Sequence, residues 1–341
     1  GIDWASFEGR RFPYRAARVS LPWRRRDADP AVRHLIVTDA ADRRIANVRR
    51  GRITREAGEL WFEPTAGPGT YHVYYLPFVM AGRSNYPKAT YPPPEDTASA
   101  TWLAAVDAAA RVAEARVVAF EAIDEFNRFD PMEVIATADE VRALAGQRPG
   151  ARYLVFPEDR LHPIRMRTDI PLRWVQAGLA DRIAGEAARG EFFAFQLGVL
   201  ALEALDNVRV TFSDLAGPSA ERLPSSTLTC LNTGGVDWKG EPFDLRLDVP
   251  EGIVQAIWCG IDVPAGSSPG AYTGRVTVAA DAAPPTTRAI ALTVRDEVAE
   301  EGGAHEPWKQ TRLKWLNSTL AQQNDVIAPY TPLVVSGRRV D

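Results

Sequence analysis

Cysteine is scarce in this chain of 341 residues, with Cys230 and Cys259 its two examples. Two cysteines are too few for a disulfide framework, and neither has the CxxC or Cys/His spacing of a zinc site. Each falls in a strand-like run, so one bridge between them and a pair of buried free thiols both remain open. The four histidines are also scattered without metal-ligand spacing. We therefore expect no metal and no cofactor.

Long apolar runs are missing as well. The most apolar stretch, 192–205, is shorter than the roughly 20 residues that cross a bilayer, and no basic-then-apolar segment precedes Asp3. We therefore predict no membrane partner and no signal peptide. The formal charge is -4, from 40 basic and 44 acidic residues, which argues against nucleic acid as a partner. Residues 1–60 are rich in arginine, but Arg outnumbers Lys 36 to 4 throughout, so we assign this excess to composition rather than to acidic sugars.

Familiar catalytic motifs are not found. The sequence has no GxSxG, no P-loop and no GxGxxG after a strand. The nearest approach to a pair of catalytic carboxylates is Glu158 with Asp159, followed by His162, Arg165 and Arg167. Ion pairs with these basic neighbours would depress the pKa of both carboxyl groups, which favours a structural turn over catalysis.

Many short segments of the chain have apolar residues at every second position. Tyr71, Val73 and Tyr75 alternate with His72 and Tyr74 after a Gly-Pro-Gly turn, which predicts an antiparallel sheet in the first ninety residues. Further alternating runs are expected to form a β-sandwich, namely 192–200, 207–213, 244–249, 272–278 and 290–294. The predicted fold class is therefore mainly β, with antiparallel β-sandwich domains.

Helical periodicity interrupts this pattern. Apolar residues three and four apart predict one long amphipathic helix over 96–117, and a capping box from Thr137 to Glu140 predicts a short one that ends at Gly146. We expect a β-rich domain over 1–180 with this helical insertion at about 95–146. A β-sandwich domain then follows over 181–300, and 301–341 holds a linker and the start of a truncated domain.

An exposed aromatic ring can stack on the apolar face of a sugar while polar neighbours bind its hydroxyl groups. Trp238 lies beside Asp237 and Lys239 in a predicted turn, which makes Trp238 and Asp237 candidates for carbohydrate binding. Core packing is the competing explanation for any of the nine tryptophans, and for Trp258 it is the favoured one.

Several segments together resemble the N-terminal β-sandwich region of glycoside hydrolase family 123-like proteins, most densely from about Glu191 to Pro332. None of them is a catalytic motif. They are EFFAFQLGV (191–199), NV (207–208) with FSDL (212–215), CLNTGGVD (230–237), WCGIDVP (258–264), PGAYTG (269–274), RLKWLNST (312–319) and PYTP (329–332).

The resemblance implies a sugar-cleaving enzyme in which sandwich domains precede a (β/α)8 catalytic barrel. In that family an Asp-Glu pair assists attack by the substrate's own acetamido group. The Asp-Glu pairs of this chain, at 124–125, 139–140 and 296–297, do not lie where a barrel strand ends, so we carry over none of them. A barrel needs about 200 residues, far more than follow Pro307. We therefore expect a fragment without catalytic residues, and whether the chain is itself an enzyme stays uncertain.

The expected function is a non-catalytic scaffold or accessory region of a glycoside hydrolase-like protein that acts on glycans, with N-acetylhexosaminides implied by the resemblance. Its expected partners are the glycan substrate and its own C-terminal catalytic domain. Arg312 and Trp315, near the domain junction, would contribute to a glycan cleft. The resemblance favours a secreted or periplasmic location. The alternatives are an independent carbohydrate-binding module, a stand-alone enzyme that uses Glu158 and Asp159, and a purely structural or adhesive sandwich.

Overall fold

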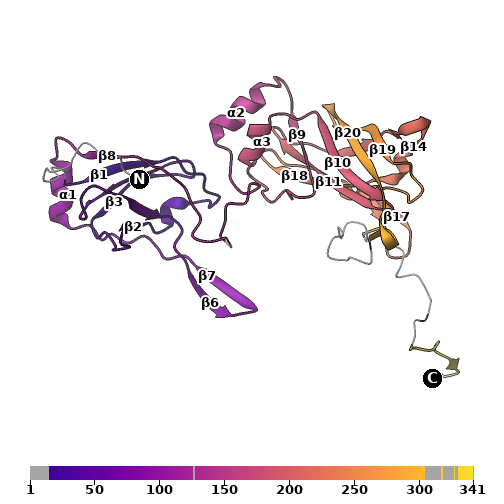
Figure 1. The fold of residues 1–341 in the computed structure, drawn as a ribbon, viewed down its shortest axis with the longest axis horizontal. Coiled ribbons are helices and arrows are strands. Elements are labelled where there is room, and N and C mark those ends of the chain that lie inside the picture. Colours follow the sequence, from indigo (N-terminus) through magenta and orange to yellow (C-terminus); the bar gives the residue numbers. More distant parts are fainter. Residues whose placement is uncertain (1–14, 126, 304–315, 318–325, 327–328, 341) are drawn as a thin grey trace. The chain divides into compact units, whose positions relative to one another are not determined.

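The computed structural model describes residues 15–125, 127–303, 316–317, 326 and 329–340 (Figure 1). The chain divides into two compact units, Gly1–Ala138 and Asp139–Asp341. The first predicted boundary lies at residue 180, whereas strand β9, helix α3 and nearly all of helix α2 precede that residue and belong to the second unit. The predicted three-part division stays a prediction.

The first unit is built from two small sheets. The larger sheet has the strand order β3-β4-β1-β8, in which β1 pairs with β8 in parallel and the other pairs are antiparallel. β2 and β5 form a separate antiparallel pair, and their apolar residues join the same core as those of the larger sheet. The strands are β1 (Ala17–Leu21), β2 (Ile36–Asp39), β3 (Val48–Ile53), β4 (Gly58–Phe62), β5 (Tyr71–Tyr74) and β8 (Ala113–Ala115).

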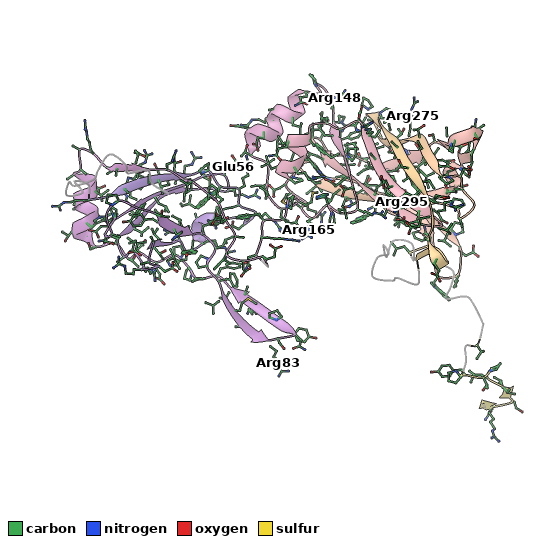
Figure 2. All side chains as sticks on the ribbon, viewed as in Figure 1. Glu56, Arg83, Arg148, Arg165, Arg275 and Arg295 are labelled. Atoms are coloured by element: carbon green, nitrogen blue, oxygen red, sulfur yellow. The ribbon has the colours of Figure 1, made fainter. Side chains whose placement is uncertain are left out.

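The predicted alternation around β5 is confirmed. Tyr71, Val73 and Tyr75 pack against the core of the first unit, whereas His72 and Tyr74 are exposed. A further hairpin, β6 (Val79–Arg83) with β7 (Tyr86–Thr90), stands away from both sheets and is exposed along its whole length (Figure 1). Figure 2 shows the side chain of Arg83 at the tip of this hairpin.

The long helix predicted over 96–117 is wrong in length. Helix α1 (Ala100–Asp107) begins after Ser99, whose side chain accepts a hydrogen bond from the Trp102 amide, and it ends well before residue 117. Ala113–Ala115 is extended instead, because its backbone pairs with β1 at the edge of the larger sheet. The short predicted helix is confirmed as α2 (Ala138–Gly146), and α3 (Leu172–Ala177) was not predicted. Among the described residues, no helix combines the length and the apolar composition that spanning a bilayer requires.

The second unit is a sandwich of two sheets around one apolar core (Figure 1). One sheet has the order β15-β18-β11-β9 and the other β10-β20-β19-β13-β14, with β12 also paired to β19. The predicted mainly β fold class is thus confirmed. The strands are β9 (Tyr153–Glu158), β10 (Arg182–Arg189), β11 (Phe192–Ala201), β12 (Arg209–Phe212), β13 (Leu215–Ala216), β14 (Arg222–Leu223), β15 (Leu228–Cys230), β18 (Val254–Asp262), β19 (Gly270–Ala280) and β20 (Ala283–Val298).

One strand predicted in this unit differs from the structure. The run 244–249 is not a continuous strand, because Pro242–Asp244 pairs as β17, Leu245 is exposed, and Val249 forms an isolated bridge with Leu205. At the start of the predicted linker, Glu300–Gly303 forms a short turn of 3-10 helix. The remaining short elements are β16 (Gly234–Val236), β21 (Val335–Ser336), β22 (Arg339–Val340) and the 3-10 turns Pro30–Val32, Pro218–Ala220, Ser225–Thr227 and Glu300–Gly303.

Candidate functional site

The predicted sugar-binding residues Trp238 and Asp237 lie in the turn between β16 and β17. The Asp237 carboxylate accepts hydrogen bonds from the Lys239 amide at 2.8 Å and the Glu241 amide at 2.9 Å, so its role within the fold is to cap the turn. Trp238 is 70% exposed, and the Lys239 ammonium lies 5.1 Å from the centre of its ring system. The ammonium lies over one face of the indole. An exposed indole is the kind of ring surface on which a sugar can stack.

Arg312 and Trp315 lie outside the described residues. The nearby Asn317 is described, and its side-chain oxygen accepts a hydrogen bond from the Val236 amide at 3.0 Å. A Cβ atom at Gly235 would overlap this Asn317 side chain, so the close approach requires glycine at that position. Asn317 therefore contacts the same hairpin that presents Trp238.

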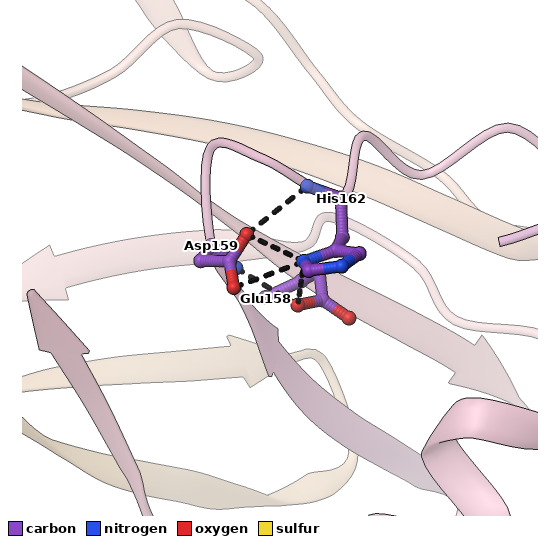
Figure 3. Close-up of side chains that lie close together, drawn as sticks. All are labelled: Glu158, Asp159 and His162. Atoms are coloured by element: carbon purple, nitrogen blue, oxygen red, sulfur yellow. Dashed lines mark hydrogen bonds and ion pairs between the residues drawn. The ribbon is translucent and has the colours of Figure 1, made fainter. Parts of the chain in front are cut away.

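Glu158, Asp159 and His162 form an acidic and imidazole cluster at the end of β9 (Figure 3). The His162 Nδ1 atom lies 2.8 Å from one Asp159 carboxylate oxygen, and the same oxygen accepts the backbone amides of Leu161 and His162. Glu158 is buried, and one of its carboxylate oxygens accepts the Asp159 amide at 3.0 Å. These bonds fold the chain sharply after the strand.

Helix α3 supplies the other partners of Glu158. The indole Nε1 of Trp174 donates to the Glu158 carboxylate at 2.9 Å, and the Arg173 guanidinium donates to it at 3.2 Å. The same guanidinium lies 3.7 Å from Asp159, and its hydrogen bond to Glu158 raises the pKa of Arg173. The buried Gln196 fixes the loop further, because it donates to the Asp159 carbonyl and accepts the Ile164 amide.

The contacts of Arg173 limit the chemistry that this cluster can perform. A metal ion between Glu158, Asp159 and His162 would have to compete with Arg173, which already supplies a positive charge to both carboxylates. A general acid has to reach the substrate atom that it protonates, whereas both carboxylates are engaged by Arg173 and by backbone amides of their own loop. The geometry therefore identifies an anchor for helix α3 and the 158–164 loop.

The first unit contains a groove of about 490 Å³, which the sequence analysis did not identify. Its lining includes residues 70–75, the segment 115–123, Trp23 and Phe62. Its volume lies within the range of small-molecule pockets. The alternation at 71–75 was visible in the sequence, but the pairing that brings 115–123 beside it depends on β8, which was predicted as helix.

The first unit matches the model of a known protein family. Residues 7–123 match the family model described as glycoside hydrolase 123, N-terminal domain. The match lies upstream of the segments at 191–332 on which the sequence resemblance was strongest, and it includes the strands of both small sheets and the groove. No curated protein gives a significant match.

Two solved structures share some similarity with this chain. One similar structure is a family 123 glycoside hydrolase from Clostridium perfringens, described in terms of glycolipid glycan hydrolysis, at 18% identity and a TM-score of 0.31. That match covers 35% of this chain and 24% of the other, so the chain spans about a quarter of that enzyme's length. Another is the PapD-like domain 7 of human CEP192, at 15% identity and a TM-score of 0.24, over 36% of this chain and 84% of that domain. On the family match, residues 7–123 resemble the N-terminal domain of glycoside hydrolase 123, and the predicted resemblance to this family is confirmed.

Proposed function

We propose that this chain is the non-catalytic accessory region of a glycoside hydrolase-like protein and supports a catalytic domain that follows it. The observation that carries the proposal is the family match of residues 7–123 to a domain described as N-terminal in glycoside hydrolase 123. We further propose that the parent protein acts on N-acetylhexosaminide glycans, as the family resemblance implies.

The carboxylates of the described residues support a non-catalytic role. Glu158 and Asp159 are held by Arg173 and His162, as described above. Each Asp-Glu pair is also engaged locally: Glu125 pairs with Arg128, Asp139 pairs with Arg142 at the start of α2, and Asp296 pairs with Arg189 at the end of β10. Each of these carboxylates lies on the exposed surface, where salt bridges are common and weak, and not in the water-excluded pocket that holds a general acid.

The expected result with the purified chain is no turnover of aryl N-acetylhexosaminides or other aryl glycosides above the buffer blank. The measurement is release of the aryl group across a broad glycoside panel. Glu158→Gln serves as the matched variant, because it removes the charge of the buried carboxylate in the cluster and keeps its shape. Hydrolysis that is present in the natural chain and lost in Glu158→Gln would show that the chain is a stand-alone enzyme.

The scaffold role has its own test in the gene that encodes this chain. We expect the reading frame downstream of Asp341 to encode alternating strands and helices, with an Asp-Glu pair at the end of one strand. The longer product should then hydrolyse aryl N-acetylhexosaminides, and deletion of residues 1–303 should lower its melting temperature. A downstream sequence without a barrel, or a barrel whose stability does not depend on this region, would contradict the proposal.

A second function is favoured by the exposure of Trp238. As an independent carbohydrate-binding module, the chain would bind glycans in isolation, and Trp238→Ala should weaken that binding at least about tenfold through loss of the stacking platform. Glycan-array retention measures the effect. Tyr86→Ala is the matched control, since Tyr86 is a comparably exposed aromatic residue on β7. Equal losses in the two variants, or no retention of the natural chain, would exclude a site at Trp238.

A further inference from the structure

Cys230 and Cys259 lie directly opposite one another on the neighbouring antiparallel strands β15 and β18. The Leu231 amide donates to the Trp258 carbonyl at 2.9 Å, so the hydrogen bond flanks the cysteine pair instead of joining it. Opposed residues in such a non-hydrogen-bonded position have Cα atoms about 4.5 Å apart and the closest side chains of the ladder. This separation falls within the range of about 4.4–6.8 Å that disulfides span.

The two thiols have different surroundings. Cys259 belongs to the core of the sandwich and is fully buried, which raises the pKa of its thiol. Cys230 ends the edge strand and is 8% exposed. The hydrogen bond from Cys259, helped by the Thr233 side chain and the amides of Asn232 and Thr233, lowers the pKa of Cys230 to about 6. A thiolate at Cys230 beside a neutral thiol at Cys259 is the arrangement that thiol–disulfide exchange uses.

We propose that Cys230 and Cys259 are a redox-active pair that closes into a cross-strand disulfide when the protein meets a disulfide oxidant such as oxidised glutathione. The Cys230 thiolate attacks one sulfur of the oxidant, forms a mixed disulfide and releases one thiolate of the oxidant. Cys259 then loses its proton, attacks the Cys230 sulfur and displaces the second thiolate. The protein loses two electrons and two thiol protons, and the oxidant is reduced to two thiols.

Access to the pair comes from the shortness of β15. This strand spans Leu228–Cys230 and lies at the edge of its sheet, paired with β18. Short edge strands open locally at low free-energy cost, because few hydrogen bonds have to break. Local opening exposes Cys230 first, and closure returns it to its position opposite Cys259.

The bond would fix the base of the hairpin that carries Trp238. A disulfide between residues 230 and 259 closes a loop that contains both β16 and β17. Such a crosslink stabilises mainly by restricting the unfolded chain. For a loop of this length in a unit of this size, the expected gain in melting temperature is about 5–10 °C.

The test compares the full chain after equilibration with oxidised glutathione and after reduction with dithiothreitol. We expect thiol titration in denaturant to find two thiols in the reduced form and none in the oxidised form. Peptide mapping should show a crosslink between the peptides of Cys230 and Cys259, with the mass of two hydrogens lost. The oxidised form should also melt about 5–10 °C higher.

Cys230→Ser and Cys230→Ala are the matched variants, since both keep the core residue Cys259. Either should fold and should show no oxidant-dependent gain in melting temperature. Retention of both thiols after oxidation, a glutathione adduct as the end product, or a crosslink between chains would each overturn the proposal. An oxidised form that melts no higher than the reduced one would overturn the proposed fixing of the hairpin. These outcomes do not depend on whether the chain serves a glycoside hydrolase.

Discussion

Replacement of Arg25 by alanine is expected to destabilise the first unit by about 3 kcal/mol. The Arg25 side chain is 0% exposed, and it binds both oxygens of the Asp27 carboxylate, at 2.9 and 2.6 Å. Its guanidinium also lies over the rings of Trp23, at 4.8 Å, and Tyr75, at 5.3 Å. The alanine variant leaves the largely buried Asp27 without its cation and removes both ring contacts, so the loss exceeds that of a surface ion pair.

Hydrogen exchange of the β1 and β5 amides measures this effect, because it reports on the first unit separately from the second. Arg25→Lys keeps the charge but not the two-pronged geometry, and we expect it to recover less than half of the lost stability. Arg128→Ala is the control, since its ion pair with Glu125 is exposed, and it should change stability by less than about 0.5 kcal/mol. If Arg25→Ala and Arg128→Ala were equally mild, the buried pair would not hold the unit together.

Arg25 also shows where sequence analysis reaches its limit. It lies in the run Arg24-Arg25-Arg26, which is typical of an exposed charged segment. Its burial depends on Tyr75, which is fifty positions away along the chain and reaches Arg25 through the pairing of β2 with β5. The alternation at 71–75 itself was predicted correctly, because it expresses only which residues of one strand face the core.

The helix prediction was limited for the same reason: the sequence shows which residues are apolar, but not which strand they pair with. The 3.6-residue period that predicted a helix over 96–117 is satisfied from Ala100 to Asp107, where Trp102 and Val106 are buried. Of the apolar residues that continue the period, Ala113 faces the core from strand β8 instead, and Val117 packs against the same core just after that strand. A short apolar segment fits both periods, and the pairing partner in β1 decides between them.

At the candidate sites, too, contacts between residues close in the chain were predicted, and contacts between distant segments were not. A turn at Asp237 and Trp238 was predictable because side-chain capping of a turn involves neighbouring residues. Ion pairs around Glu158 and Asp159 were predicted, and His162 was among the expected partners. Arg173 and Trp174 were not expected, because they reach the carboxylates only when helix α3 folds back over β9. The sequence thus predicted that these carboxylates form ion pairs, but it did not identify Arg173 as a partner.

Gly198→Ala is expected to destabilise the second unit by about 3 kcal/mol, although it adds a single methyl group. Gly198 lies in the middle of β11, opposite Phe156 of β9, and a Cβ atom there would overlap the indole of Trp174. That indole cannot shift freely. It is stacked on Phe156 at 4.5 Å between ring centres, and its Nε1 donates to the buried Glu158 carboxylate. The added methyl therefore forces Trp174 out and leaves Glu158 without this donor.

A double-mutant cycle makes this mechanism testable by denaturant unfolding, with hydrogen exchange of the β9 and β11 amides as the local readout. Trp174→Ala alone should cost about 3–5 kcal/mol, since it empties the space over Gly198. In that background Gly198→Ala should cost less than about 1 kcal/mol, because the overlapping ring is gone. Gly266→Ala is the control, as no atom lies within 4 Å of its Cβ position, and it should be close to neutral. If the costs of Gly198→Ala and Trp174→Ala were additive, the glycine would be required by the strand itself, and not by the packing of helix α3 over it.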